Sequence, residues 1–174
     1  MANNSFNLQA DAKAPRKLLK HYVNVGMGGT QEWELLGRGV SDSSISLNPE
    51  KSEETDIYGI TDSGVTAWKP TQNFEPFTIR GGSKLAFMLH EMWMNNTPEL
   101  LSQFEILTVY GYVGSESAGF DADVQTNCTI SPSSIGGSAY VDMPVEVTYS
   151  NAKTRGTVTM NAEHNPTFVP NSAA

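Results

Sequence analysis

The apolar and polar positions alternate with a period of two over much of the second half of the chain. Residues 121–130 and 139–149 show this alternation, and residues 155–163 repeat it over a shorter stretch. Such a pattern predicts strands with one face towards a core and the other towards solvent. In the first of these strands, the side chains expected to face inward are Ala122, Val124, Thr126, Cys128 and Ile130.

A different pattern occupies residues 104–113, where apolar side chains fall on both parities. It predicts a strand that is covered on both faces. Shorter strands are expected at residues 22–25, 32–36, 40–47 and 74–80, each bounded by glycine, proline or asparagine.

Only residues 84–95 have the spacing of a helix, and Ser83 is the expected N-cap. One face carries apolar residues at helical spacing, namely Leu85, Met88, Leu89 and Met92. Phe87, Trp93 and Met94 widen the apolar arc beyond what one sheet face needs. We therefore expect a neighbouring molecule to cover part of this helix.

Three segments lack a clear period: residues 1–20, the long polar stretch 48–73, and residues 164–174. A chain of 174 residues fits a single domain. Together, these patterns predict a mainly β protein: an antiparallel β-sandwich or barrel over residues 21–163 with one flanking α-helix. We expect an N-terminal arm (1–20), a long inter-strand loop (48–73) and a C-terminal arm (164–174) around it.

Charge is distributed unevenly along this domain. The net charge is −8, yet Lys13, Arg16, Lys17 and Lys20 form a basic cluster near the N-terminus. No Lys or Arg lies between Lys84 and Lys153. Binding to nucleic acid through phosphates, or to an anionic membrane, needs an excess of positive charge on the binding surface. We therefore exclude both for the body of the protein. The basic cluster either docks on an acidic surface, of this chain or of a neighbour, or is a solvated tail.

Residue patterns that would carry catalysis or metal binding are incomplete. The stretch HEMWM at residues 90–94 lacks the second histidine of a zinc helix, and Cys128 lies on the expected inward side of a strand. We expect no enzyme, metal or cofactor. No run approaches the roughly 18 apolar residues of a membrane span, and residues 1–15 lack the apolar segment of a secretory signal.

The segment EWELLGRGVSDSSISLNPEKSEETDIYG, residues 32–59, resembles the N-terminal part of major tail (tail tube) proteins of long-tailed bacteriophages. The order of elements over residues 23–163 is similar too. The resemblance implies a β-sandwich subunit that closes, six copies at a time, into rings with a continuous inner β-barrel. It also implies stacking of rings into a tube around a tape-measure protein, with tail terminator and baseplate proteins as further partners. The location would be the virion tail, assembled in the host cytoplasm.

The resemblance assigns roles to two sets of residues, and the charge pattern of the late strands adds a third. The inter-ring loop would be carried by Asn48, Glu50, Glu53, Glu54, Asp56, Tyr58, Asp62 and Trp68, and an inter-subunit arm by Lys13, Arg16, Lys17 and Lys20. Asp121, Asp123, Asp142 and Glu146 are the candidate lumen-facing acids, on strand faces without Lys or Arg. DNA would pass such a wall without specific binding.

A second interpretation remains open from the sequence. A β-sandwich with Trp33, Trp68 and several tyrosines is also typical of a carbohydrate-binding module or a capsid decoration protein. The long polar stretch and the two arms favour the assembling subunit, because a solitary binding domain does not need three such connectors.

Overall fold

The structure is a computed structural model that describes residues 6–26, 29–161 and 165–171. Its strands are β1 (Leu19–Asn24), β2 (Trp33–Leu36), β3 (Ile45–Ser46), β4 (Pro49–Thr55), β5 (Thr61–Trp68), β6 (Thr71–Phe74), β7 (Phe104–Ser115), β8 (Gly119–Pro132), β9 (Val145–Thr148), β10 (Lys153–Met160) and β11 (Pro166–Pro170). The helical elements are α1 (Lys84–Met94) and two short 3-10 turns, η1 (Arg16–Leu18) and η2 (Pro98–Ser102).

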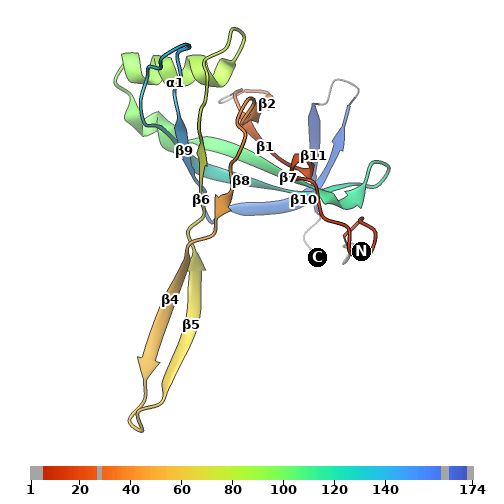
Figure 1. The fold of residues 1–174 in the computed structure, drawn as a ribbon, viewed down its shortest axis with the longest axis vertical. Coiled ribbons are helices and arrows are strands. Elements are labelled where there is room, and N and C mark those ends of the chain that lie inside the picture. The colour runs from red at the N-terminus through yellow and green to blue at the C-terminus, as the bar shows by residue number, and fades with distance from the viewer. Residues whose placement is uncertain (1–5, 27–28, 162–164, 172–174) are drawn as a thin grey trace.

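The body of the protein is one curled antiparallel sheet (Figure 1). The strand order is β2-β1-β7-β8-β9-β6-β3, with β10 added to β8 and β11 to β10. The expected fold class, mainly β and antiparallel with one α-helix, is therefore confirmed. The strand β8 is long enough to pair with β7 along one side and with β10 and then β9 along the other.

A bulge in β8 lies where its partner changes. Phe104 pairs with Cys128 and Ile106 with Gln125, so β8 holds one extra residue there, and Asn127 has a positive φ of 56°. Residues of the same parity consequently point to opposite faces on the two sides of the bulge. Our expectation of one inward face for residues 122–130 was wrong for this reason. Ala122 and Val124 lie in one apolar cluster, and Cys128 and Ile130 in another.

The two apolar clusters occupy the two faces of the sheet. Phe104 and Ile106 belong to the larger cluster, which also packs against α1, and Leu107 and Val109 belong to the smaller one. The prediction that this strand is covered on both faces is confirmed, since all four side chains are buried.

The helix α1 starts at the expected N-cap. Ser83 Oγ accepts a hydrogen bond from the Ala86 amide at 3.2 Å. Glu34 of β2 adds a second cap, because its Oε2 accepts from the backbone amides of Lys84 (2.8 Å) and Leu85 (3.0 Å). A carboxylate in this position satisfies free amides and complements the helix dipole. It also ties α1 to the edge strand of the sheet.

The long polar stretch is not the loop that the sequence predicted. Residues 49–68 form the antiparallel hairpin β4–β5, which extends away from the sheet (Figure 1). Every residue of β4 is exposed, as is every residue of β5 except the half-buried Ala67. The segment keeps its polar character because neither face of the hairpin packs on the body.

Other strands are shorter than expected. Within the predicted strands 40–47 and 139–149, only β3 and β9 are regular. The predicted strand 74–80 is absent, because β6 ends at Phe74. Pro144 precedes β9 and has no amide to donate, which agrees with the late start of that strand. Asp142 forms isolated β-bridges with Thr78 and Gly136, which lie outside the named strands.

The expected arms are partly tied to the sheet. Phe6 forms a bridge with Val113, and the Asn7 side chain donates to the carbonyl oxygens of Gly111 (3.2 Å) and Gly114 (2.8 Å). In the C-terminal segment, residues 166–170 form β11. Residues 1–5, 164 and 172–174 of the expected arms lie outside the described residues. No helix in the described part of the chain combines the length and apolar character that crossing a membrane requires.

Candidate assembly surfaces

Within the described residues, the contacts that anchor the hairpin β4–β5 lie at its base. Asn48, at a positive φ of 43°, donates from its side-chain amide to the Lys69 carbonyl and to Thr71 Oγ1, both at 3.1 Å. An ion pair joins Lys69 Nζ to Glu50 Oε1 at 2.5 Å. An isolated two-stranded hairpin is marginally stable in water, so a hairpin of this length needs contacts that the described chain does not supply.

The turn of the hairpin holds its apolar residues outward. Asp56 Oδ1 accepts from the amides of Tyr58 and Ile60, both at 2.9 Å, and the Asp56 amide donates to the Ile60 carbonyl at 2.9 Å. Ile57 is 93% exposed and Tyr58 82% exposed. A turn that is ordered by its own carboxylate presents these side chains at low entropic cost to a partner.

All eight residues predicted for the inter-ring segment lie on this hairpin or its base. Asn48 is at the base, and the turn carries Asp56 and Tyr58. The strands carry the others, which are Glu50, Glu53 and Glu54 on β4 and Asp62 and Trp68 on β5. Their common exposure gives one acidic, apolar-tipped projection.

A second surface is the sheet face opposite α1, formed by β3, β6, β9 and the second half of β8. Register places Asn73, Glu146 and Ser131 side by side in one row. The next row contains Ser46, Thr71, Thr148 and Thr129. Alternate residues such as Val145, Val147 and Phe74 point into the core, so these polar ones face away from it. We call this seven-residue surface the polar face; it carries one carboxylate and no Lys or Arg.

Only one of the four predicted lumen-facing acids lies on the polar face, and it is Glu146. Asp142 is half-buried and accepts a hydrogen bond from Thr78 Oγ1 at 2.6 Å. Asp121 and Asp123 lie at the other end of β8, before the bulge, where they point to the opposite side. The sequence missed Thr71, Asn73 and Ser131, whose neighbourhood depends on pairing between distant strands.

Asp123 belongs instead to a polar row that crosses the sheet, buried at His21, Thr108 and Asp123 and exposed at Arg155. His21, Thr108, Asp123 and Arg155 are successive partners on β1, β7, β8 and β10. The Tyr110 hydroxyl donates to Asp123 Oδ2 at 2.6 Å, and Lys153 Nζ lies 3.4 Å from the same oxygen. Burial, with the Asp123 charge beside it, raises the pKa of Tyr110 above its usual range. The carboxylate of Asp121 pairs with Arg155 at 3.3 Å.

His21 is a buried titratable group of this row. Its Nδ1 lies 3.4 Å from Thr108 Oγ1. Burial, and to a lesser degree the positive charge of Arg16, lowers its pKa from 6.5 to about 4. The imidazole is therefore neutral in the folded protein at neutral pH, and its role is in the core.

The basic cluster surrounds η1 and the start of β1. Lys13, Arg16 and Lys17 are exposed and Lys20 is half-buried. Arg16 donates to the carbonyl oxygens of Leu19 (2.5 Å) and Ser43 (2.9 Å), which fixes the segment on the body. Gly111 of β7 allows this approach, because a Cβ there would lie 2.8 Å from the Leu18 carbonyl oxygen.

The outer face of α1 is a further exposed surface, and it is apolar. Phe87, Trp93 and Met94 are each about three-fifths or more exposed. Trp33 packs against the smaller apolar cluster, and Trp68 sits on the hairpin. The tryptophans therefore do not form the shared aromatic platform that stacking on a sugar requires.

The described residues offer little support for a metal site or for a nucleophilic cysteine. No group of three or more His, Cys, Asp or Glu side chains is placed to hold a metal ion within residues 6–26, 29–161 and 165–171. Cys128 is buried, and burial raises the pKa of its thiol, which disfavours the reactive thiolate.

Comparisons with known proteins give structural likeness only. No family model and no curated protein matches the sequence. The chain is similar in structure to the cap of the anti-feeding prophage, a tube-terminating cap, with 15% identity, a TM-score of 0.48, and coverage of 90% of this chain and 99% of that chain.

Two similar chains come from an extracellular contractile injection system called PVC, both in the extended state. One is in its sheath–tube complex, with 11% identity, a TM-score of 0.49, and coverage of 86% and 95%. The other is in its sheath/tube terminator, with 11% identity, a TM-score of 0.48, and coverage of 84% and 99%. At these identities and scores, the three likenesses carry no conclusion about what the present chain does.

Proposed function

We propose that this protein is a structural subunit of a phage tail or of a tail-derived particle, and that its copies close into rings that stack as a tube. The observation that supports this most strongly is the hairpin β4–β5. It projects from the body with an apolar tip and without packing contacts of its own along its strands. A projection of this kind is stabilised when it binds another molecule.

The open margins of the sheet support the same proposal. Among the described residues, β2, β3 and β11 each pair on one side only, so their other sides could accept a further strand. A closed ring of subunits removes such edges. Six copies per ring is the number implied by the resemblance to tail tube proteins.

In the proposed tube, the polar face lines the lumen. Its hydroxyl and amide groups and single carboxylate offer no cation to phosphates, so a DNA duplex would pass without displacing its counterions. The exposed apolar face of α1 then lies on the outer side of the wall, opposite the polar face. A tape-measure protein in the lumen, with terminator and baseplate proteins at the ends, completes the proposed set of partners.

Electron microscopy of the purified full chain at high concentration tests the proposal. We expect rings or stacked rings with a central channel. A protein that stays a monodisperse monomer at every concentration would contradict the proposed function.

The lumen assignment has a separate test on assembled tubes. Asn73→Lys with Glu146→Lys should make tubes retain short DNA duplexes that a nuclease cannot reach. The control pair Glu91→Lys with Glu99→Lys, exposed residues on α1 and η2, should bind only duplexes that the nuclease digests. Nuclease-sensitive binding with the Asn73 and Glu146 pair would place the polar face outside the channel.

A further inference from the structure

A groove of about 720 Å³ lies against the smaller apolar cluster. Val109, Phe120 and Met160, on β7, β8 and β10, form its apolar floor. Lys17, Lys20 and Glu116 also line it, so its charged side chains include two positive groups and one negative group. A groove of this size with an apolar floor and few charged groups is suited to a compact apolar segment.

The hairpin tip has the complementary chemistry. Ile57, Tyr58 and Ile60 are exposed at the tip, which is the largest concentration of exposed apolar side chains on the hairpin. Around them lie the carboxylates of Glu53, Glu54, Asp56 and Asp62, and residues 52–68 contain no Lys or Arg. An apolar tip with an acidic surround matches an apolar floor with lysines at its rim.

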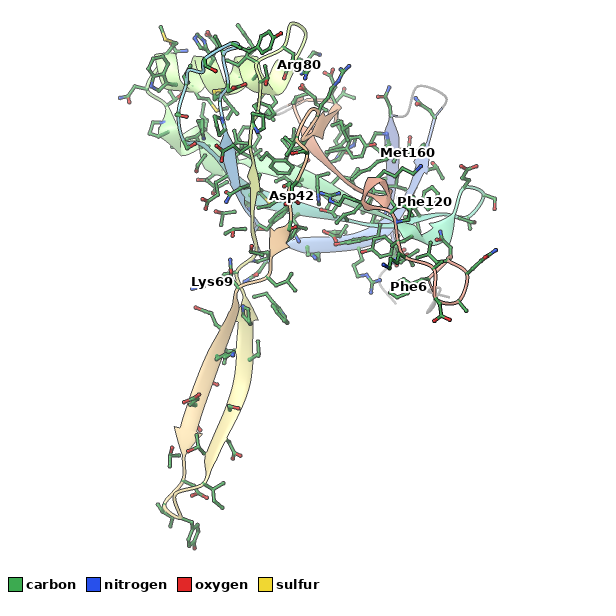
Figure 2. All side chains as sticks on the ribbon, in the orientation of Figure 1. Phe6, Asp42, Lys69, Arg80, Phe120 and Met160 are labelled. Atoms are coloured by element: carbon green, nitrogen blue, oxygen red, sulfur yellow. The ribbon has the colours of Figure 1, made fainter. Side chains whose placement is uncertain are left out.

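The tip and the groove of one chain lie far apart. Figure 2 shows Phe120 and Met160 on the body, well away from Lys69 at the hairpin base, while the tip points in another direction. A strand of eight residues such as β5 extends roughly 26 Å at about 3.3 Å per residue. A contact between tip and groove therefore joins two copies.

We infer that the hairpin tip of one copy seats in the groove of a second copy, with Ile57 and Tyr58 on the apolar floor and the hairpin carboxylates near Lys17 and Lys20. This inference rests on the proposed function and names the contact that joins its subunits. The two surfaces differ, so the contact is head-to-tail, and repetition gives closed rings or an extended stack. It also assigns a role to the basic cluster at η1.

A photocrosslinking probe tests the position of the tip. In the full chain, Tyr58 is replaced by p-benzoylphenylalanine, and isotopically light and heavy chains are mixed before irradiation. We expect crosslinked peptides that join the probe of one copy to the segment around Phe120 or Met160 of another. Crosslinks confined to any other surface, or to the same copy, would overturn the inference.

Charge reversal tests the electrostatic part of the contact. Lys17→Glu with Lys20→Glu, and separately Glu53→Lys with Glu54→Lys, should each raise the concentration needed for assembly by about tenfold. The four changes combined should return that concentration to within about threefold of the wild-type value. The control pair Glu91→Lys with Glu99→Lys should leave it unchanged. Failure of the combined variant to recover assembly would count against the pairing of these two surfaces.

The proposed function and the contact between tip and groove can be contradicted separately. Tubes whose Tyr58 probe crosslinks away from the groove leave the proposed function standing and overturn the inference. A wild-type chain that never assembles overturns both.

Discussion

The curled sheet and the hairpin β4–β5 differ in where their stabilising contacts come from. In β7, both faces are covered, and Phe104, Ile106 and Leu107 are fully buried. In β4, a strand of seven residues, every side chain is exposed. The sheet is stabilised by apolar area removed from water within one chain. Within the described residues the hairpin removes almost none, so apolar burial inside one chain contributes little to its stability.

Under the proposed function, one chain contains a region that folds by itself and a region that assembly would complete. Removing a contact in the sheet should lower the stability of the single molecule. Removing a contact on the hairpin should lower assembly and leave the single molecule as stable as before. The following predictions test this separation, starting with the largest expected effect.

Phe104→Ala should have the largest effect on the folded monomer. The ring is completely buried in the larger apolar cluster. Its removal leaves a cavity, and we expect the free energy of unfolding to fall by about 3–5 kcal/mol. Chemical denaturation followed by tryptophan fluorescence measures this change. Phe87→Ala, on the exposed face of α1, is the matched control and should change little. Equal losses for the two rings would contradict the description of the core.

His21 should make the stability of the body depend on pH. Its folded pKa of about 4 lies below the unfolded value of 6.5, so the unfolded chain takes up the proton first as the pH falls. The contribution of His21 to the free energy of unfolding is fully present above pH 6.5 and decreases between pH 6.5 and 4. Between pH 7 and pH 5 the loss should be about 2 kcal/mol.

The variant His21→Gln isolates that contribution. Unfolding titrations at pH 7 and pH 5 should show a smaller loss in this variant than in the wild type, by about 2 kcal/mol. The difference between the two proteins removes the contribution of carboxylates that titrate in the same range. An equal loss in both proteins would mean that His21 is not protected from protonation.

Glu34→Ala should have a smaller effect on the body. The carboxylate accepts hydrogen bonds from two amides at the start of α1, and its loss should cost about 1 kcal/mol of unfolding free energy. Glu32→Ala is the control, because Glu32 only pairs with Lys84 at the surface and should contribute less than about 0.5 kcal/mol. A larger loss for Glu32 than for Glu34 would contradict the capping role.

The sequence predicts the elements whose pattern is local. The helix, its Ser83 cap and the double-faced burial of β7 follow from spacing and parity along a single segment, and all three are present. The bulge at Asn127 could not be predicted, because one inserted residue leaves the alternation of β8 intact while it reverses the faces. The hairpin was missed as structure because its strands have no buried face to give an apolar period.

The same reasoning applies to the candidate surfaces. The hairpin residues were found together because they are contiguous in sequence. The polar face joins Asn73 to Glu146 and Ser131 through pairing of strands that are far apart in the chain. The groove likewise joins Lys17 to Phe120 and Met160. Neither surface has a signature in any single segment.

The smallest effect on the monomer is expected at the hairpin tip, and it separates the two regions most sharply. Ile57→Ser with Tyr58→Ser removes two large apolar side chains that are 93% and 82% exposed, so no buried area is lost within the chain. The free energy of unfolding of the unassembled protein should stay within about 0.5 kcal/mol of the wild type. Assembly should weaken in the same variant, because those side chains would be buried only between copies. Denaturation below the assembly concentration and sedimentation above it measure the two effects on one protein. A destabilised monomer would show that the tip packs on its own chain, and unchanged assembly would show that no partner covers it.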